Sequence, residues 1–277
     1  MYVRNDSTIR TEELSLVGRS QVIAMRSYRP DDGKGLPVVL YFHGGGFTSG
    51  CLDDAAEAAT QISRITPAWV VSVGYSLAPR FPFPTALEDT FIAMQWAVRN
   101  AKAWGADPGR IGVAGHDAGG NLATCLAAVV RDRAEFKISA QALLAPLLDP
   151  SLTRVAGDWD ARTSDLNARQ CARGYRAYLP DPVVGMHPYA APIESRRLKG
   201  LPPAFIGSPE SDFLHAESER YASQLSAAGV PTEIFHCPNA SHEPVASNFH
   251  VLAEVAEFFQ RWLAPRLGRR KATLLQF

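Results

Sequence analysis

Residues 109–123 read GRIGVAGHDAGGNLA, and this stretch decides the fold class. Its first half is a β-branched, apolar run that predicts a buried strand, and the Ala-rich run over residues 118–131 predicts a helix. Small residues occupy positions 115, 118, 119 and 120 in and after the turn between them. A sharp strand-to-helix elbow needs small residues because the flanking chain crowds it. Asp117 is therefore expected at the apex of an elbow, at a helix N-terminus that favours a negative charge.

Similar apolar runs recur along the chain and alternate with helical stretches. Strands are predicted over residues 12–17, 21–28, 36–42, 68–73, 110–115, 138–145, 203–208 and 231–237. Helices are predicted over residues 53–65, 85–103, 118–131, 215–228 and 248–263, with Asp53 as a candidate N-cap and a capping box at Thr85 and Glu88. This alternation predicts an α/β protein whose mostly parallel sheet carries helices on both faces.

The interval 150–192 breaks this alternation because it is rich in charged residues, Tyr and Pro and contains no clear strand. Proteins of the α/β class place their sites at the carboxyl edge of the sheet. We therefore expect residues 150–192 to form a short cap or lid excursion over that edge. The interval is too short to be an independent domain, so the chain is interpreted as a single domain of residues 1–277.

The composition excludes several classes of partner. The chain has 277 residues, 46% of them hydrophobic, and its 28 basic and 28 acidic residues give a net charge of zero. No basic block indicates a nucleic-acid partner, and no apolar run reaches the roughly 18 residues of a membrane span. The four cysteines form no CxxC pair and the N-terminus has no signal-peptide core, so we expect a cytoplasmic protein with free thiols and no metal or organic cofactor.

A glycine-rich motif, HGGGF at residues 43–47, directly follows the predicted strand 36–42. Three glycines let the backbone turn tightly and point its N–H groups outward. A loop of this kind, together with the N–H of the residue after the elbow apex, here Ala118, predicts an oxyanion hole.

Two further polar residues follow predicted strands. Asp212 comes after the strand 203–208, and His242 comes after the strand 231–237. Each residue alone has an ordinary structural interpretation, because an Asp often forms a turn or an N-cap and a lone His in a loop is usually a surface residue. Together with Asp117 they give the chain order nucleophile, acid, base, which belongs to α/β-hydrolases.

These motifs resemble those of the hormone-sensitive-lipase-like branch of the α/β-hydrolases, a group of esterases with an HGGG loop. The segment GYSLAPRFPFPTALED at residues 74–89 and the segment at residues 198–230 resemble further parts of this family. The resemblance spans residues 13–263 and implies an α/β-hydrolase fold. It also implies dimerisation through the last strand and helix, as in many relatives, so a homodimer is left open.

The resemblance also implies roles for individual residues. His242 corresponds to the catalytic base, and Asp212 corresponds to the acid that orients it. The N–H groups of Gly44, Gly45 and Ala118 correspond to the oxyanion hole, with Gly46 as an alternative to either of the first two. Asp117 stands where the family has its nucleophilic serine.

An aspartate at this position changes the chemistry that is expected. If a carboxylate attacks an ordinary ester, the intermediate expels the carboxylate again, because a carboxylic acid has a pKa of about 4, far below that of an alcohol. At a saturated carbon, by contrast, a carboxylate can open an epoxide or displace a halide and keep the carbon as an alkyl ester. The GHD of this elbow resembles that of epoxide hydrolases, although there an aromatic residue typically follows.

The leading hypothesis from the sequence is therefore covalent attack of Asp117 on a saturated electrophilic carbon of a small, largely uncharged substrate. Water activated by His242 then hydrolyses the ester. Tyr175, Tyr178 and Tyr189 are candidates for the acid that protonates an epoxide oxygen, although most of them are expected to pack in the core.

Three alternatives stay open. In the first, the chain is a carboxylesterase-type hydrolase with weak or altered activity on activated esters, after a natural or engineered Ser→Asp change at position 117. In the second, it is a lyase or isomerase in which Asp117 and His242 act as non-covalent acid and base. In the third, it is a pseudohydrolase that binds a small ligand without turnover.

Overall fold

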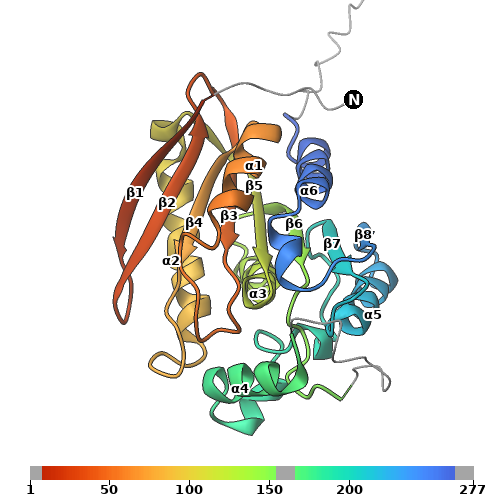
Figure 1. Cartoon of the computed structure of the whole chain (residues 1–277). Coiled ribbons are helices and arrows are strands. Elements are labelled where there is room, and N and C mark those ends of the chain that lie inside the picture. Colours follow the sequence, from red (N-terminus) through yellow and green to blue (C-terminus); the bar gives the residue numbers. More distant parts are fainter. Residues whose placement is uncertain (1–7, 154–165, 266–277) are drawn as a thin grey trace, which may run out of the picture.

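The structure is a computed structural model that describes residues 8–153 and 166–265 (Figure 1). Its centre is an eight-stranded sheet with the order β1-β2-β4-β3-β5-β6-β7-β8. The strands are β1 (Ile9–Val17), β2 (Val22–Pro30), β3 (Leu36–Phe42), β4 (Trp69–Gly74), β5 (Ala106–His116), β6 (Ile138–Leu144), β7 (Ala204–Pro209) and β8 (Thr232–Cys237). All eight predicted strands are confirmed within a few residues at each end.

Most of the sheet is parallel, as the alternation of strands and helices predicts. β1 pairs with β2, and β2 with β4, in antiparallel register, whereas every pairing from β4 to β8 is parallel. The carboxyl ends of the parallel strands therefore meet at one edge of the sheet, and this edge carries the site described below.

Helices cover both faces of the sheet. They are α1 (Ala56–Ile65), α2 (Thr85–Asn100), α3 (Ala118–Arg133), α4 (Ala168–Tyr178), α5 (His215–Ala227) and α6 (Phe249–Trp262), with short 3₁₀ helices η1 (Ala101–Trp104), η2 (Pro182–Met186), η3 (Pro192–Glu194) and η4 (Glu243–Ala246). Side chains alternate along β3, so Val38 and Leu40 join one core with α2, α3 and α5, while Val39 and Tyr41 join a second core with α1 and α6.

Two predicted helix caps are wrong. Thr85 is the first residue of α2 rather than its cap, the N-cap is Pro84 and makes no side-chain bond, and Glu88 pairs with Arg19 at 2.7 Å. Asp53 likewise does not cap α1, since its carboxylate pairs with Arg26 at 2.7 Å. In both cases the carboxylate that the local sequence pattern predicts as part of a cap instead forms an ion pair with an arginine far away in the sequence.

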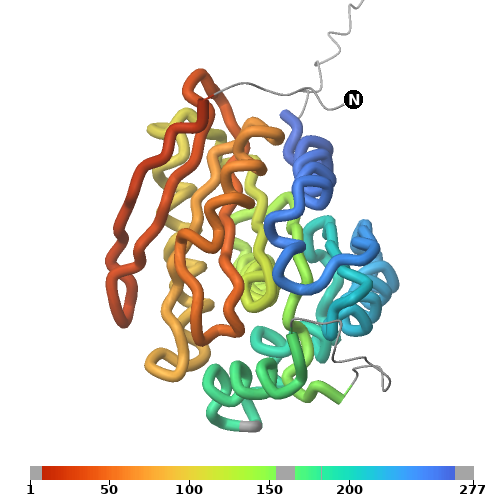
Figure 2. Tube along the Cα trace, viewed as in Figure 1, coloured from red at the N-terminus to blue at the C-terminus, as the bar shows by residue number. Residues whose placement is uncertain are grey.

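The sequence patterns do not predict α4, which lies in the interval 150–192. Asn167 caps it: the Asn167 side chain accepts from the N–H of Gln170 at 3.2 Å, and the Gln170 side chain accepts from the N–H of Asn167 at 3.0 Å. This reciprocal pair is a capping box, and it was the available local signal for the helix. Figure 2 shows the green chain around α4 gathered at the bottom of the view, beyond the end of the sheet.

None of the helices in the described part of the chain has the length and apolar character that a membrane crossing requires.

Candidate active site

The elbow forms as predicted between β5 and α3. Asp117 joins them with φ 54° and ψ −119°, a conformation that residues with a side chain rarely adopt. Its backbone is fixed on both sides: the Asp117 N–H donates to Leu144 at 2.9 Å, and the Leu147 N–H donates to the Asp117 carbonyl at 3.1 Å. A Cβ at position 119 would lie 2.1 Å from the Phe42 carbonyl oxygen, so glycine is required there.

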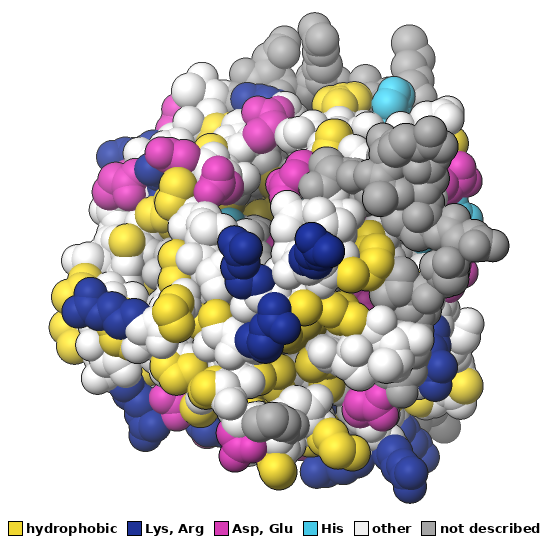
Figure 3. All heavy atoms as spheres, turned by 60° about the horizontal axis from the view of Figure 1, so that its bottom comes forward, with side chains coloured by type: hydrophobic (Ala, Val, Ile, Leu, Met, Phe, Trp, Pro, Cys, Tyr) yellow, Lys and Arg dark blue, Asp and Glu magenta, His cyan; other side chains and the backbone are white. Residues whose placement is uncertain are grey.

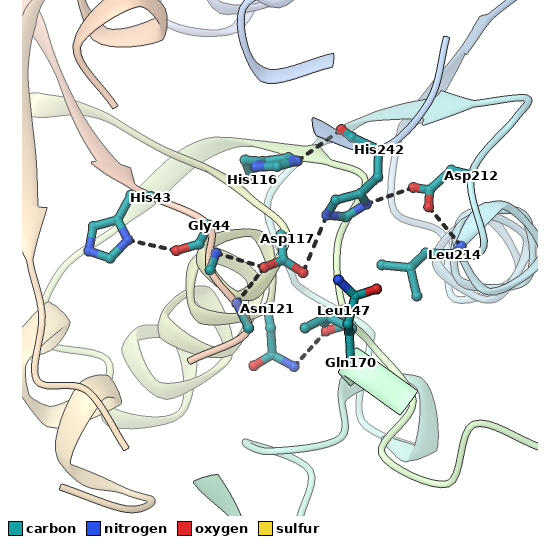
Figure 4. Close-up of polar contacts among 12 residues, drawn as sticks. His43, Gly44, His116, Asp117, Asn121, Leu147, Gln170, Asp212, Leu214 and His242 are labelled. Carbon is teal, nitrogen blue, oxygen red and sulfur yellow. Dashed lines mark hydrogen bonds and ion pairs between the residues drawn. The ribbon is translucent and has the colours of Figure 1, made fainter. Parts of the chain in front are cut away.

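The glycine-rich loop after β3 reaches the side chain of this elbow. The N–H groups of Gly45 and Gly46 donate to Oδ2 of Asp117 at 2.9 Å and 2.7 Å (Figure 4). The pair of loop donors is thus Gly45 and Gly46 rather than Gly44 and Gly45. Glycine at position 44 leaves room for the neighbouring ring, because a Cβ there would lie 2.7 Å from Nδ1 of His116. The N–H of Ala118 remains a predicted third donor.

His242 and Asp212 approach the elbow from the loops that follow β8 and β7. Nδ1 of His242 lies 3.0 Å from Oδ2 of Asp212, and Nε2 lies 3.5 Å from Oδ1 of Asp117. The other oxygen of Asp212 accepts from the N–H of Leu214 at 3.1 Å. The structure therefore brings together the three residues that the sequence analysis singled out, and all three side chains are buried (Figure 4).

A sequence model of a family described as alpha/beta hydrolase fold matches residues 39–246. The chain belongs to this family.

Several relatives and solved structures to which the chain is similar carry the names of esterases. The chain is 38% identical to Esterase LipI of Mycobacterium tuberculosis over 242 residues, which cover 84% of this chain and 74% of the relative. It is 37% identical to Carboxylesterase NlhH of the same organism over 226 residues, or 80% and 70% of the two chains. The structure of EstE1, a carboxylesterase from a metagenomic library, aligns with a TM-score of 0.85 at 31% identity and covers 94% of this chain and 92% of that one. The chain is thus an esterase/lipase-like α/β-hydrolase.

Charge dominates the buried site of this α/β-hydrolase. Burial by itself would raise the pKa of Asp117, but the hydrogen bond and charge of His242, with the charge of His116 and the N–H of Gly46, lower it to about 2. Burial would likewise lower the pKa of His242, but the negative charges of Asp212 and Asp117 raise it well above 6.5. The two carboxylates therefore favour the protonated form of the imidazole that lies between them.

This arrangement has two chemical consequences. The charges of both carboxylates favour the proton on His242, so the loss of either charge lowers the pKa of the ring. Oδ2 of Asp117 also occupies the position between the Gly45 and Gly46 donors, where the carbonyl oxygen of a substrate would bind.

The sequence analysis did not single out His116, which precedes the apex. Its Nε2–H donates to the backbone carbonyl of His242 at 3.2 Å, and the two imidazole rings lie 4.7 Å apart between centroids. The same side chain borders Gly44. His116 therefore links the elbow, the glycine-rich loop after β3 (called here the oxyanion loop, after its predicted role) and the loop that carries His242. Its place next to the apex was the only sequence signal for it.

The three tyrosines that the sequence proposed as acids lie in different surroundings. Tyr175 and Tyr178 are buried on α4, and burial raises the pKa of both well above 10. Tyr178 stacks on Phe47 with 4.0 Å between ring centroids. Tyr189 is not a site residue in this arrangement, because its hydroxyl donates to Asp132 at 2.7 Å. Tyr175 directly follows Gly174, which packs against the carbonyl oxygen of Gly46, so Tyr175 is kept as the candidate acid.

α4 lies directly on the oxyanion loop. A Cβ at Gly174 would lie 2.5 Å from the carbonyl oxygen of Gly46, so the helix and the loop approach closely only because position 174 has no side chain. Cys171 and Tyr175 on the same face of α4 are buried. Asp117, which accepts from the N–H of Gly46, retains only 3% of its surface exposed.

A second carboxyl group that the sequence analysis missed is Glu217 of α5. It is buried, accepts from the N–H of Leu148 at 3.3 Å, and burial raises its pKa well above 4.5. Among the described residues, no group of three or more His, Cys, Asp and Glu side chains is arranged to hold a metal ion.

Proposed function

We propose that the chain is a carboxylesterase-type hydrolase for small, largely uncharged esters, with an aspartate in the position of the nucleophile. The observation that carries this proposal is the convergence of the Gly45 and Gly46 N–H groups on one oxygen of Asp117. Two donors in this position suit the oxygen of a carbonyl group under attack. The similarity to proteins named as esterases supports the same reaction class.

Asp117 restricts the esters that react. With an alkyl ester the intermediate returns to substrate, because a carboxylate leaves more readily than an alkoxide. Phenols and other acidic alcohols are better leaving groups than alkyl alcohols. With them the difference in leaving ability between the Asp117 carboxylate and the alcohol oxygen becomes smaller. We therefore assign activated esters as substrates, with a low turnover.

His242 acts in this reaction first as an acid and then as a base. Oδ1 of Asp117 attacks the carbonyl carbon, the proton of His242 goes to the departing oxygen, and the acyl group stays on Asp117 as an anhydride. Asp117 has then lost its charge, so the neutral imidazole accepts a proton from water while that water attacks the anhydride. The acid leaves, and the carboxylate and the imidazolium are both restored.

Replacement of the apex residue tests this function. Asp117→Ser frees the oxyanion donors and removes one anion beside His242, so hydrolysis of p-nitrophenyl acetate is expected to rise by about 10²-fold or more. His242→Ala in the same background should abolish the gain. Asp132→Ser is the matched control and should change nothing. Absence of any gain in Asp117→Ser would contradict the proposal.

A second function is favoured by the orientation of the Asp117 carboxylate. Oδ2 is held by two donors, whereas Oδ1 faces His242. If Oδ1 attacks a saturated carbon and an epoxide oxygen or a halide leaves, the resulting alkyl ester has its carbonyl oxygen already between the donors that stabilise attack by water. Tyr175 is the candidate acid for an epoxide oxygen.

Isotope labelling separates the two reactions. A single turnover of a short epoxide or haloalkane in heavy-oxygen water should place the label in the Asp117 carboxylate if the second function operates. Product formation without label at this residue excludes covalent attack on that substrate. Turnover of activated esters, and of no epoxide or haloalkane, leaves the first proposal standing alone.

We also propose that the interval 150–192 acts as a cap within a single domain. The support comes from α4, which belongs to this interval and contacts the oxyanion loop through Gly174. Residues 154–165 of the interval lie outside the described part of the chain.

A further inference from the structure

The outward face of α4 carries three positive charges. Arg169, Arg173 and Arg176 follow one another at intervals of four and three residues, which places them on one face of the helix. All three are exposed, and none forms an ion pair with another described residue. The helix contains no Asp or Glu, although the chain as a whole has 28 basic and 28 acidic residues. The positive charge is therefore local to this surface.

Exposed apolar side chains follow α4 closely in the chain. η2 begins shortly after α4 and presents Val183 and Met186, which are 78% and 76% exposed. Figure 3 turns this end of the molecule forward and shows basic side chains beside hydrophobic ones. Asp181 precedes η2, and its carboxylate already accepts from the N–H of Val183 at 2.9 Å.

A fourth arginine belongs to the neighbouring loop. Arg80 is exposed, and its loop is attached to the end of α4, where the Phe83 N–H donates to the Tyr178 carbonyl at 2.8 Å. We call the group of residues Arg80, Arg169, Arg173, Arg176, Val183 and Met186 the α4 surface.

We propose that the α4 surface docks on an anionic lipid bilayer. Guanidinium groups pair with phosphates through parallel hydrogen bonds, and each basic residue near an anionic bilayer raises the partition coefficient about fivefold. An acidic peptide would match the arginines as well, but Val183 and Met186 favour a partner with an apolar layer just beneath its charges. The combination of arginines with exposed apolar side chains therefore favours a lipid headgroup surface over an acidic peptide.

The two faces of α4 then have different partners. The inner face contacts the oxyanion loop through Gly174, while the outer face would rest on lipid. A docked molecule holds the buried elbow behind α4 close to the bilayer. The inference does not depend on the reaction at Asp117, because it concerns binding alone.

Vesicle co-sedimentation of the full chain tests the proposal. We expect the protein to sediment with vesicles that contain phosphatidylglycerol, to stay in solution with pure phosphatidylcholine vesicles, and to be released at high salt. The variant R169Q/R173Q/R176Q should lower the partition coefficient on the order of a hundredfold. V183S/M186S should lower it as well.

The matched control removes the same charge elsewhere. Lys34, Arg99 and Lys102 are exposed residues near the amino ends of β3 and β5, at the opposite end of the sheet from α4. K34Q/R99Q/K102Q should therefore sediment like the wild type. Circular dichroism verifies that each variant is folded.

Three results would overturn the proposal. One is a failure to sediment with anionic vesicles. Another is an equal loss of binding in the control variant, which would indicate an effect of net charge. The third is full binding by V183S/M186S together with equal binding to polyglutamate, which would identify an acidic protein as the partner.

Discussion

Nε2 of His242 lies 3.5 Å from one oxygen of Asp117, while Nδ1 of the same ring lies 3.0 Å from Asp212. A single buried imidazolium therefore neutralises one of two carboxylates, and each carboxylate supports the proton on the ring. The carboxylate at the elbow both accepts from the N–H groups of Gly45 and Gly46 and raises the pKa of His242.

Removal of one carboxylate should lower the pKa of His242 toward its ordinary value. Asp117→Asn keeps the shape of the side chain and removes its charge, so we expect the pKa of His242 to fall. The measurement is an NMR titration of the imidazole nitrogens in both proteins. Asp132→Asn is the control, because it removes a carboxylate far from the ring. An identical titration of His242 in wild type and Asp117→Asn would rule out the coupling.

The same pair makes stability depend on pH. Asp117 has a lowered pKa of about 2, so its contribution is complete above its unfolded value near 4 and is lost as the pH falls through about 2. His242 has a raised pKa, so its contribution is complete below about 6.5 and is lost as the pH rises through the folded value. The free energy of unfolding, measured by denaturant titration, should fall more steeply between pH 4 and 2 in the wild type than in Asp117→Asn. An equal fall of the free energy of unfolding in both proteins between pH 4 and 2 would refute the contribution of Asp117.

Glycine at position 119 should be indispensable. A Cβ there would lie 2.1 Å from the Phe42 carbonyl oxygen, so Gly119→Ala must push β3 and α3 apart. We expect a loss of about 1–3 kcal/mol in the free energy of unfolding, together with a loss of activity. Gly185→Ala is the control, since a Cβ at that position meets no atom within 4 Å. Equal stability of the two variants in thermal and denaturant unfolding would show that the elbow tolerates a side chain.

His116 should act through the position of His242. Its ring donates to the His242 carbonyl at 3.2 Å, so His116→Leu releases the loop of the base. In the Asp117→Ser background we expect kcat for p-nitrophenyl acetate to fall about tenfold, with KM little changed, because the reacting groups lose alignment. His116→Gln retains a donor and should recover most of the loss. Equal defects in the Leu and Gln variants would indicate that only the packing of the ring matters.

The sequence predicted the eight strands, the elbow and the positions of Asp212 and His242 because these features depend on local periodicity and on motifs at strand ends. It left open which two of Gly44, Gly45 and Gly46 are the donors, because the conformation of the loop depends on how closely it approaches His116. It also did not predict that Tyr189 binds Asp132, since this contact joins residues 57 positions apart. Long-range contacts of this kind also displaced the predicted caps at Thr85 and Asp53.

The close approach of Gly174 to Gly46 makes position 174 a point of control over access to the elbow. One hydrogen atom is all that fits between α4 and the loop, so even a methyl group would act as a wedge that lifts the helix. We therefore expect a larger side chain at position 174 to move α4 away from this loop and to expose Asp117, which retains only 3% of its surface exposed, without any change to the reacting groups themselves.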